Sequence, residues 1–243
     1  MRITAISDIH GSLIDIEETD LLIIAGDWSP LEIQSTRPKM CDWLKRTFVP
    51  YLGSLPAEKI ILVAGNHDFI CDENFLNWDY MSYDLPVAPI YFDRDILNPL
   101  LRKYKLHNKI KYLDKSSTTY KGIKIYGCPD VEGCCGWAFG RAEYTMPYKD
   151  IPKCDILITH QPPRYNGLGS VMFNGVLHDL GSFLLMDAII KRKPGFVFCG
   201  HIHDGDHTEQ IYSYDDGKVT RLYNCAIKND DYEIKHVPQK VIF

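Results

Sequence analysis

Residues Ile3-Thr4-Ala5-Ile6-Ser7-Asp8-Ile9-His10 place a short apolar run directly before a serine, an aspartate and a histidine. A continuous run of this kind, rich in isoleucine, is typical of a strand buried on both faces. In open α/β sheets, ligands bind outside the carboxyl ends of the strands. Asp8 and His10 are two residues apart, so in an extended segment their side chains point the same way. The stretch therefore predicts a buried strand that delivers both side chains to one site.

Four further apolar runs have the same form, and each is followed at once by polar residues. The runs are Leu21–Ala25, Ile60–Ala64, Ile156–Thr159 and Phe196–Cys199. The residues that follow them are Gly26-Asp27, Gly65-Asn66-His67-Asp68, His160 and Gly200-His201-Ile202-His203. Each piece alone is an ordinary turn or an isolated histidine. Together, five strand ends present three aspartates, one asparagine and five histidines, which predicts metal binding.

The chemistry of these side chains narrows the class of metal. Mixed carboxylate, amide and imidazole ligands suit a borderline divalent ion such as Mn²⁺, Fe²⁺, Zn²⁺ or Co²⁺. The set contains no thiolate, which argues against a structural zinc site. The chain has eight cysteines but no C-x-x-C pair, and the adjacent Cys134-Cys135 is a poor frame for a disulfide or for zinc. Reduced thiols in the cytoplasm are the expectation.

Helical segments alternate with the strands, which predicts an α/β layered fold. The Ser182–Lys193 helix is expected to begin at a serine cap and to bury Phe183, Leu184 and Ala188. No repeat or linker divides the chain, so residues 1–243 are interpreted as one domain. The other expected helices are Cys41–Leu52 and Asp93–His107, the latter with Pro99 at an early turn or kink, and the further expected strands, which would form a second and more antiparallel sheet, are Thr118–Tyr126, Lys218–Asn224 and Tyr232–Val237.

Composition bounds the partners of the protein. The 243 residues are 45% hydrophobic and 24% charged, with a formal net charge of −5. These values are those of an ordinary globular domain. Nucleic acid is disfavoured as a partner because the balance is acidic and gives no basic footprint. No apolar run approaches the length that spans a bilayer, and no basic and apolar leader precedes the first strand, so no membrane association is expected.

The five blocks, taken in order, resemble the calcineurin-like metallophosphoesterase superfamily, whose pattern is D-x-H, G-D, G-N-H-[DE], H and G-H-x-H. They extend from Asp8 to His203, which is most of the chain. Ile125–Pro129, Gly136–Phe139 and Thr159–Pro163 resemble, within that superfamily, the metallophosphoesterase domain-containing branch. The chain departs from the related protein phosphatases, because Trp28-Ser29-Pro30 follows Gly26-Asp27 and Asp68 replaces a glutamate.

The resemblance implies a four-layer αββα sandwich with a two-metal site at the carboxyl ends of the strands. Mn²⁺ is the preferred ion, with Fe, Zn, Co or Ni as alternatives. The first metal would be held by Asp8, His10, Asp27 and His203, and the second by Asp27, Asn66, His160 and His201. Asp27 would then bridge the two ions and leave a shared position for hydroxide.

We expect hydrolysis of a small phosphodiester, such as a cyclic nucleotide or a similar small diester. Asn66, His67 and Asp68 are the expected catalytic residues: Asn66 would neutralise phosphoryl charge, and His67 would protonate the leaving alkoxide, with Asp68 orienting its imidazole. A supporting role for His67 is the alternative. Arg164 would either contact the substrate phosphate or be solvated. Trp28, Phe69, Trp137 and Phe139 are candidates for a wall that stacks on a base. The competing functions are a phosphomonoesterase or protein phosphatase, a nuclease of the same superfamily, and a non-catalytic metal-binding regulator.

Overall fold

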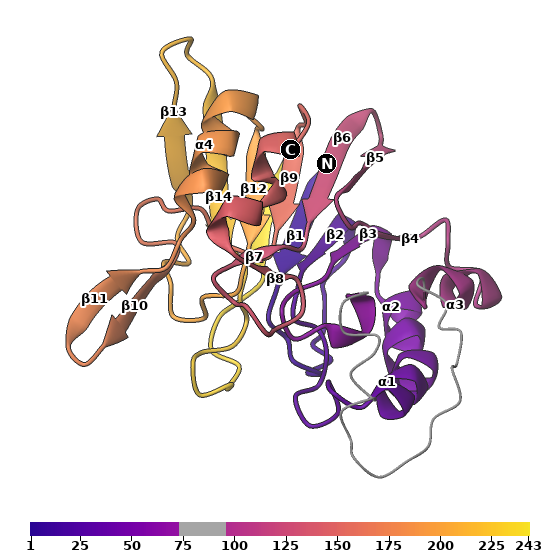
Figure 1. Ribbon diagram of the computed structural model, residues 1–243. Coiled ribbons are helices and arrows are strands. Elements are labelled where there is room, and N and C mark those ends of the chain that lie inside the picture. Colours follow the sequence, from indigo (N-terminus) through magenta and orange to yellow (C-terminus); the bar gives the residue numbers. More distant parts are fainter. Residues whose placement is uncertain (73–95) are drawn as a thin grey trace.

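The computed structural model describes residues 1–72 and 96–243, which form two sheets packed face to face between layers of helix (Figure 1). The α/β class and the four-layer αββα order expected from the sequence are confirmed. All five apolar runs that precede the polar blocks are strands. They are divided between the two sheets, three in the first and two in the second.

The first sheet has five strands in the order β15-β1-β2-β3-β4. Neighbours from β1 to β4 are parallel, and β15 pairs antiparallel with β1 along the opposite edge. Because parallel strands end on the same side, the loops after β1, β2 and β3 open at one edge of this sheet. The bounds are β1 (Arg2–Ile6), β2 (Thr19–Ala25), β3 (Ala57–Val63), β4 (Ile110–Tyr112) and β15 (Gln239–Ile242).

The second sheet has six strands in the order β13-β14-β12-β9-β6-β5. It is parallel from β14 to β6, and only its edge strands β13 and β5 are antiparallel to their neighbours. The expected more antiparallel second sheet is therefore antiparallel only at its edges. The bounds are β5 (Ser116–Tyr120), β6 (Ile123–Cys128), β9 (Ile156–Thr159), β12 (Phe196–Cys199), β13 (Gln210–Ser213) and β14 (Val219–Asn224).

The described residues also contain two small two-stranded sheets and three short 3₁₀ turns. The hairpin of β10 and β11 projects from the body of the molecule, at the lower left of Figure 1. The remaining elements are β7 (Val131–Glu132), β8 (Gly140–Arg141), β10 (Ser170–Phe173), β11 (Val176–Asp179) and the 3₁₀ turns Phe69–Cys71, Glu143–Thr145 and Pro147–Asp150.

A helical segment interrupted by a π-turn covers the outer face of the first sheet. It consists of α1 (Arg37–Trp43), a π-turn (Leu44–Phe48) and α2 (Val49–Ser54). Pro50 lies at the start of α2 and has no N–H to donate to the preceding turn. Insertion of one extra residue in the turn before it, a recognised way to accommodate such a break, gives the Val49 N–H to Leu44 carbonyl bond. The helix expected at Cys41–Leu52 is thus present and longer.

The other two helices also agree with the sequence in position. Helix α3 (Leu97–Lys103) carries Pro99 in its first turn, and the expected start of this helix at Asp93 lies outside the described residues. Helix α4 (Phe183–Arg192) begins at Ser182, whose hydroxyl accepts a hydrogen bond from the Leu185 N–H. The expected burial of Phe183 is wrong, since its side chain is 64% exposed. None of the helices in the described ranges is long and apolar enough to cross a membrane.

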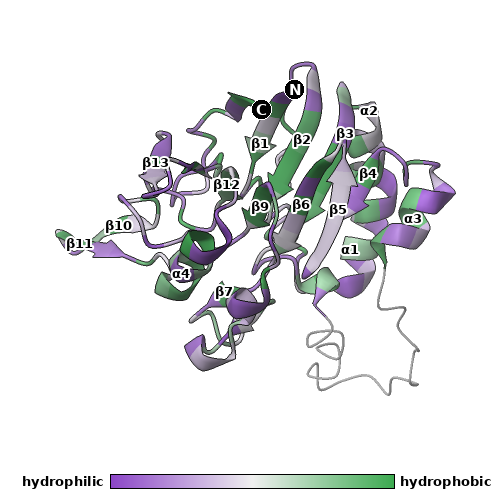
Figure 2. Cartoon of the chain, turned by 90° about the horizontal axis from the view of Figure 1, so that it is seen from above, coloured by the Kyte–Doolittle hydropathy of each residue, from purple (hydrophilic) through white to green (hydrophobic). Residues whose placement is uncertain are grey.

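Successive side chains of each strand point to opposite faces of its sheet, and this divides the hydrophobic core into layers. Leu22 and Ile24 of β2 pack against Phe48 and the other helical residues, while Ile23 of the same strand faces Phe198 of the second sheet. A third cluster packs β9 and β12 against α4. Figure 2 shows these apolar strands running through the middle of the molecule with helices on both sides. The two sheets therefore meet directly, which brings their strand ends together.

Two of the expected strands differ from the structure. Thr118–Tyr126 contains the hairpin turn between β5 and β6, where Lys121 and Gly122 both have positive φ. Tyr232–Val237 forms no strand: Tyr232 has φ +61°, and the N–H groups of Lys235 and His236 both donate to the carbonyl oxygen of Ile227. A left-handed residue breaks an extended run, so the chain turns here and only its last residues pair with β1.

Candidate metal centre

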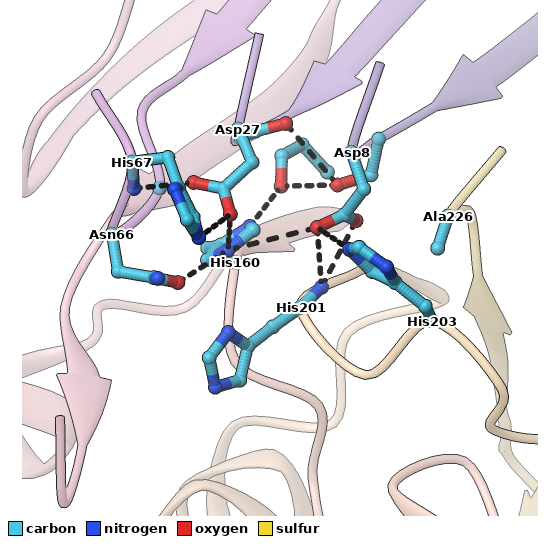
Figure 3. Close-up of polar contacts among 12 residues, drawn as sticks. Asp8, Asp27, Asn66, His67, His160, His201, His203 and Ala226 are labelled. Carbon is cyan, nitrogen blue, oxygen red and sulfur yellow. Dashed lines mark hydrogen bonds and ion pairs between the residues drawn. The ribbon is translucent and has the colours of Figure 1, made fainter. Parts of the chain in front are cut away.

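The polar blocks meet at one end of the two sheets (Figure 3). The loops after β1, β2 and β3 supply Asp8 with His10, Asp27, and Asn66 with His67. The loops after β9 and β12, in the facing sheet, supply His160 and then His201 with His203. Residues from five separate segments, up to 195 positions apart along the chain, thus lie in one cluster.

The first group of donor atoms consists of Asp8, His10 and His203, whose ligand atoms all lie within 4.8 Å of one another. Nε2 of His203 is 3.3 Å from Oδ1 of Asp8 and 3.3 Å from Nε2 of His10. All three residues are buried. Two imidazole nitrogens and a carboxylate that face one another at this separation leave room for a cation between them.

The second group consists of Asp8, Asp27 and His160 and meets the same 4.8 Å limit. Nε2 of His160 is 3.2 Å from Oδ2 of Asp27 and 3.9 Å from Oδ1 of Asp8. The same nitrogen is 3.0 Å from the side-chain oxygen of Asn66, so the amide adds a fourth donor. Asp8 is common to the two groups. Asp27 also approaches the first, because its Oδ2 lies 4.0 Å from Nε2 of His10.

His201 lies next to these groups without belonging to either. Its backbone N–H donates to the Asp8 carboxylate, at 3.0 and 3.2 Å from the two oxygens. Its imidazole ring is 5.1 Å from that of His160, and its Nε2 is 3.7 Å from Sγ of Cys134. The ring lies below the carboxylates in Figure 3. Its expected role as a ligand stays a prediction.

Strained backbone conformations, and glycines that have no Cβ, allow the donor side chains to lie this close together. Asp8, Asp27 and His201 all have φ between +52° and +69°, a region that residues with a Cβ rarely adopt. Such strain persists where the surrounding structure over-determines it, and it is concentrated at functional sites. A Cβ on Gly26 would lie 2.2 Å from Nδ1 of His160, and one on Gly200 would lie 2.3 Å from Oδ2 of Asp8. The glycines of the motif therefore make space for the side chains of His160 and Asp8.

Burial and mutual charge shift the pKa values of the donors. Burial opposes ionisation of Asp8 and Asp27, but the neighbouring histidines outweigh it and hold both carboxyl pKa values below the ordinary value. Burial likewise opposes the protonation of His160 and His203, but the two carboxylates raise both imidazole pKa values to about 9. Burial dominates at His10 and lowers its pKa to about 4.

The orientation of the imidazoles fits a bound metal ion. Nδ1 of His160 donates to the Ala25 carbonyl oxygen at 2.9 Å, and Nδ1 of His203 donates to that of Asn229 at 2.9 Å. The Nε2 lone pair of each ring is thereby directed into the cluster, as in histidines that ligate metals. Within the described residues, the ion-pair partners of Asp8 and Asp27 are histidines alone. A buried pair of carboxylates of this kind is stabilised when cations neutralise it.

Asp68 makes different contacts from those the sequence suggested. Its carboxylate accepts four hydrogen bonds, from the backbone N–H groups of Asp27, Gly65 and Ser29 and from the Ser29 hydroxyl, at 2.7–3.0 Å. Burial and the charge of Asp27 raise its pKa to about 7, although the bonds from Ser29 and Gly65 act in the opposite direction. Asp68 thus ties the loops after β2 and β3 together.

The partner of the His67 imidazole is Gln34. Nδ1 of His67 lies 2.6 Å from Oε1 of Gln34, so the expected orientation of His67 by Asp68 is corrected to orientation by Gln34. The His67 backbone N–H donates to Oδ1 of Asp27, and its Nε2 lies 3.9 Å from Oδ2 of the same residue. The sequence carried no signal for Gln34, because it lies in a loop outside every motif.

Other residues singled out in the sequence lie in different surroundings. Arg164 is 3.6 Å from Asp179 and stacks over Phe183, so its described contacts are with the hairpin and α4. Trp28 is fully buried and stacks on Phe48 in the core, and Phe139 is 2% exposed. Trp137 is 41% exposed, with its ring 4.7 Å from that of His67. No disulfide joins the cysteines of the described residues.

The four layers and the carboxylate and imidazole donors at the strand ends define a metallophosphoesterase-type fold and site. The family model for calcineurin-like phosphoesterases matches residues 1–205, and the chain belongs to this family.

Among the curated relatives, the human protein carries the name of the branch that the sequence resembled. Human metallophosphoesterase domain-containing protein 1 is 32% identical over 84% of this chain and 61% of its own length. Two Caenorhabditis elegans proteins, UPF0046 protein T07D4.2 and UPF0046 protein C25E10.12, are 28% and 31% identical over the whole chain and cover 59% and 80% of their own lengths. The chain thus spans about three-fifths of the first two relatives.

Solved structures share the fold at low sequence identity. The protein TT1561 of Thermus thermophilus aligns with a TM-score of 0.53 at 15% identity, over 91% of this chain and 88% of that one. The phosphopantetheinyl hydrolase of Mycobacterium tuberculosis aligns with a TM-score of 0.52 at 13% identity, over 99% and 95%. At these identities the likeness supports the fold alone.

Proposed function

We propose that this protein is a phosphodiesterase that uses two divalent cations, preferably Mn²⁺, to hydrolyse a small diester such as a cyclic nucleotide. The observation that carries the proposal is the meeting of two donor groups, each within 4.8 Å, that share Asp8, with Asp27 of the second group 4.0 Å from His10 of the first. Two cations held so close, when bound, supply the Lewis acidity that activates water and neutralises phosphoryl charge. Asp8, His10, Asp27 and His203 would hold one of them, and Asp27, Asn66, His160 and His201 the other.

His67 is the proposed proton donor to the leaving oxygen. The hydrogen bond from its Nδ1 to Gln34 fixes the ring, so the imidazolium form of His67 holds its transferable proton at Nε2, which faces the cluster, and is left neutral with its proton on Nδ1. Burial lowers the pKa of His67, while the charge of Asp27 raises it, and the net shift is downward. An imidazolium with a lowered pKa is a stronger acid toward a departing alkoxide. Asn66 would hold a phosphoryl oxygen with its amide, as well as contacting His160.

Metal analysis combined with two chromogenic esters tests this function. The purified protein is expected to bind two Mn²⁺ per chain and to hydrolyse bis-p-nitrophenyl phosphate faster than p-nitrophenyl phosphate. Asp8→Asn, which alters the residue common to both donor groups, should lose the metal and the activity together. Preference for the monoester would replace the diesterase assignment with a phosphomonoesterase. Full metal loading without hydrolysis of either ester would favour the non-catalytic regulator.

A further inference from the structure

A row of four rings crosses the metal centre. The ring centroids of Trp137 and His67 are 4.7 Å apart, those of His67 and His10 are 4.9 Å apart, and those of His10 and Tyr232 are 5.0 Å apart. The two inner rings belong to site histidines. The two outer residues, Trp137 and Tyr232, are 41% and 39% exposed. Each end of the row is thus a partly exposed aromatic residue in contact with a histidine of the cluster.

The Trp137 end is fixed to the loop that carries the proposed acid. The N–H of Ala138 donates to the carbonyl oxygen of Asn66 at 3.2 Å, and the N–H of Trp137 donates to the carbonyl oxygen of Cys134 within its own turn. The indole also lies 5.7 Å from the ring of Phe69. Because these contacts hold the indole against His67, a leaving group that receives a proton from His67 departs beside this ring.

The Tyr232 end is fixed to the loop that orients a ligand. Asn229 accepts hydrogen bonds at its carbonyl oxygen from the Tyr232 N–H and from Nδ1 of His203, both at 2.9 Å. The phenol ring lies 5.3 Å from the ring of His203, edge to face. Tyr232 holds φ +61°, a conformation that costs free energy and that a glycine would adopt more easily. A tyrosine in a strained conformation beside the cluster points to a use for its side chain.

We propose that Trp137 and Tyr232 are specificity-determining residues that select diesters with a planar group on each side of the phosphorus. Trp137 contacts the planar leaving group, and Tyr232 contacts the planar group of the ester that stays on phosphorus. Aromatic rings bind planar groups by offset or edge-to-face contact, without reading a particular pattern of hydrogen bonds. The inference rests on the proposed diesterase function and extends it to the substrate class.

Two diesters with the same leaving group separate the two roles. Bis-p-nitrophenyl phosphate and methyl p-nitrophenyl phosphate both release p-nitrophenol, but only the first leaves an aryl group on phosphorus. Trp137→Ala should raise KM for both diesters by about five- to tenfold, the usual worth of one aromatic contact. Tyr232→Ala should raise KM for bis-p-nitrophenyl phosphate alone by a similar factor and abolish the preference for it. In both variants kcat should change less than KM.

Matched variants separate contact with the substrate from support of the fold. Trp137→Phe and Tyr232→Phe keep an aromatic ring, so their KM values should be close to those of the wild-type protein. Tyr144→Ala removes a tyrosine that is 91% exposed and lies outside the row, and it should change neither constant. Metal content is measured for every variant, and Trp137→Leu or Tyr232→Leu replaces an alanine variant that fails to fold or to load metal.

Three outcomes would overturn the inference. If the metal-loaded wild-type protein hydrolysed neither diester, the proposed function and this inference would fail together. If it hydrolysed both while the Trp137 and Tyr232 variants kept the wild-type KM values, the function would stand and the inference alone would fail. An equal rise in KM for both diesters in the Tyr232 variant would also reject the inference. Such a result would show that Tyr232 does not distinguish the aryl group from the methyl group that stays on phosphorus.

Discussion

Nδ1 of His203 donates a hydrogen bond to the carbonyl oxygen of Asn229 at 2.9 Å. The bond leaves Nε2 of His203 facing Oδ1 of Asp8, 3.3 Å away. His160 is oriented in the same way by the carbonyl oxygen of Ala25. Backbone carbonyls thus position two of the proposed ligands, and the shape of the loops sets the geometry of the site. Changes that shift the loop backbone should therefore act on metal binding even when every ligand is kept.

Gly200→Ala is expected to weaken metal binding by about 10- to 100-fold, the range seen when the supports of metal ligands are altered. A Cβ at this position would lie 2.0 Å from the Ser7 hydroxyl oxygen and 2.3 Å from Oδ2 of Asp8, so the Asp8 carboxylate must move. Calorimetric titration with Mn²⁺ measures the loss of affinity.

The control for this variant lies at the other end of the same strand. Gly195 precedes β12, and a Cβ there would meet the Asp155 carbonyl oxygen at 3.5 Å, an ordinary contact. Gly195→Ala should bind Mn²⁺ as the unaltered protein does. Equal affinity in the Gly200 and Gly195 variants would show that the crowding around Asp8 does not limit metal binding.

Asp68→Asn is expected to lower the free energy of unfolding by about 2–3 kcal/mol at pH 8, where the carboxylate is ionised. An asparagine keeps one acceptor oxygen but turns an NH₂ group toward the backbone N–H groups that Asp68 now accepts from. Urea unfolding measures the change. Ser29→Ala removes the hydroxyl bond alone and should cost about 1 kcal/mol. Equal costs for the two variants would mean that the backbone N–H bonds to Asp68 add no stability beyond that of the Ser29 hydroxyl bond.

The site was easier to predict from sequence than the connections that support it. Asp8 and His203 belong to short motifs directly after apolar runs, and such motifs need only local spacing to be found. Gln34 and Tyr232 lie in irregular loops, where a side chain is placed by contacts with distant segments. The pairing of β15 with β1 is of the same kind, since it joins the two ends of the chain. Long-range pairing leaves no periodic trace in a short strand.

As the pH rises, the stability of the metal-free protein should fall, whereas its affinity for Mn²⁺ should increase. In the metal-free protein, the pKa values of His160 and His203 are raised from 6.5 to about 9, mainly by Asp27 and Asp8 working against burial. The stability from these charge pairs is fully present below pH 6.5 and is lost as the pH rises through 9. Metal binds the unprotonated rings, so the affinity for Mn²⁺ should rise by about tenfold per pH unit for each proton displaced.

Two measurements check this linkage. Thermal unfolding of the EDTA-treated protein should show a falling midpoint between pH 7 and 9. Calorimetric titration with Mn²⁺ over the same range should show increasing affinity, with proton release visible as a dependence on the ionisation heat of the buffer. His178→Ala, in the exposed β11 strand, should change neither curve. A flat affinity profile would contradict the raised pKa values.

His67→Ala is expected to reduce kcat by about 10²- to 10⁴-fold on a diester whose leaving group is an alkoxide, because such a group needs a proton as it departs. On a p-nitrophenyl diester the loss should be much smaller, since nitrophenolate leaves without one. Gln34→Ala should lose about tenfold on the alkoxide, because Gln34 only fixes the ring through Nδ1. Stopped assays at saturating Mn²⁺ measure kcat of each variant relative to the wild-type protein on each of the two diesters. A purely structural role for His67 would lower both rates equally, and that result would assign the leaving-group proton to another donor.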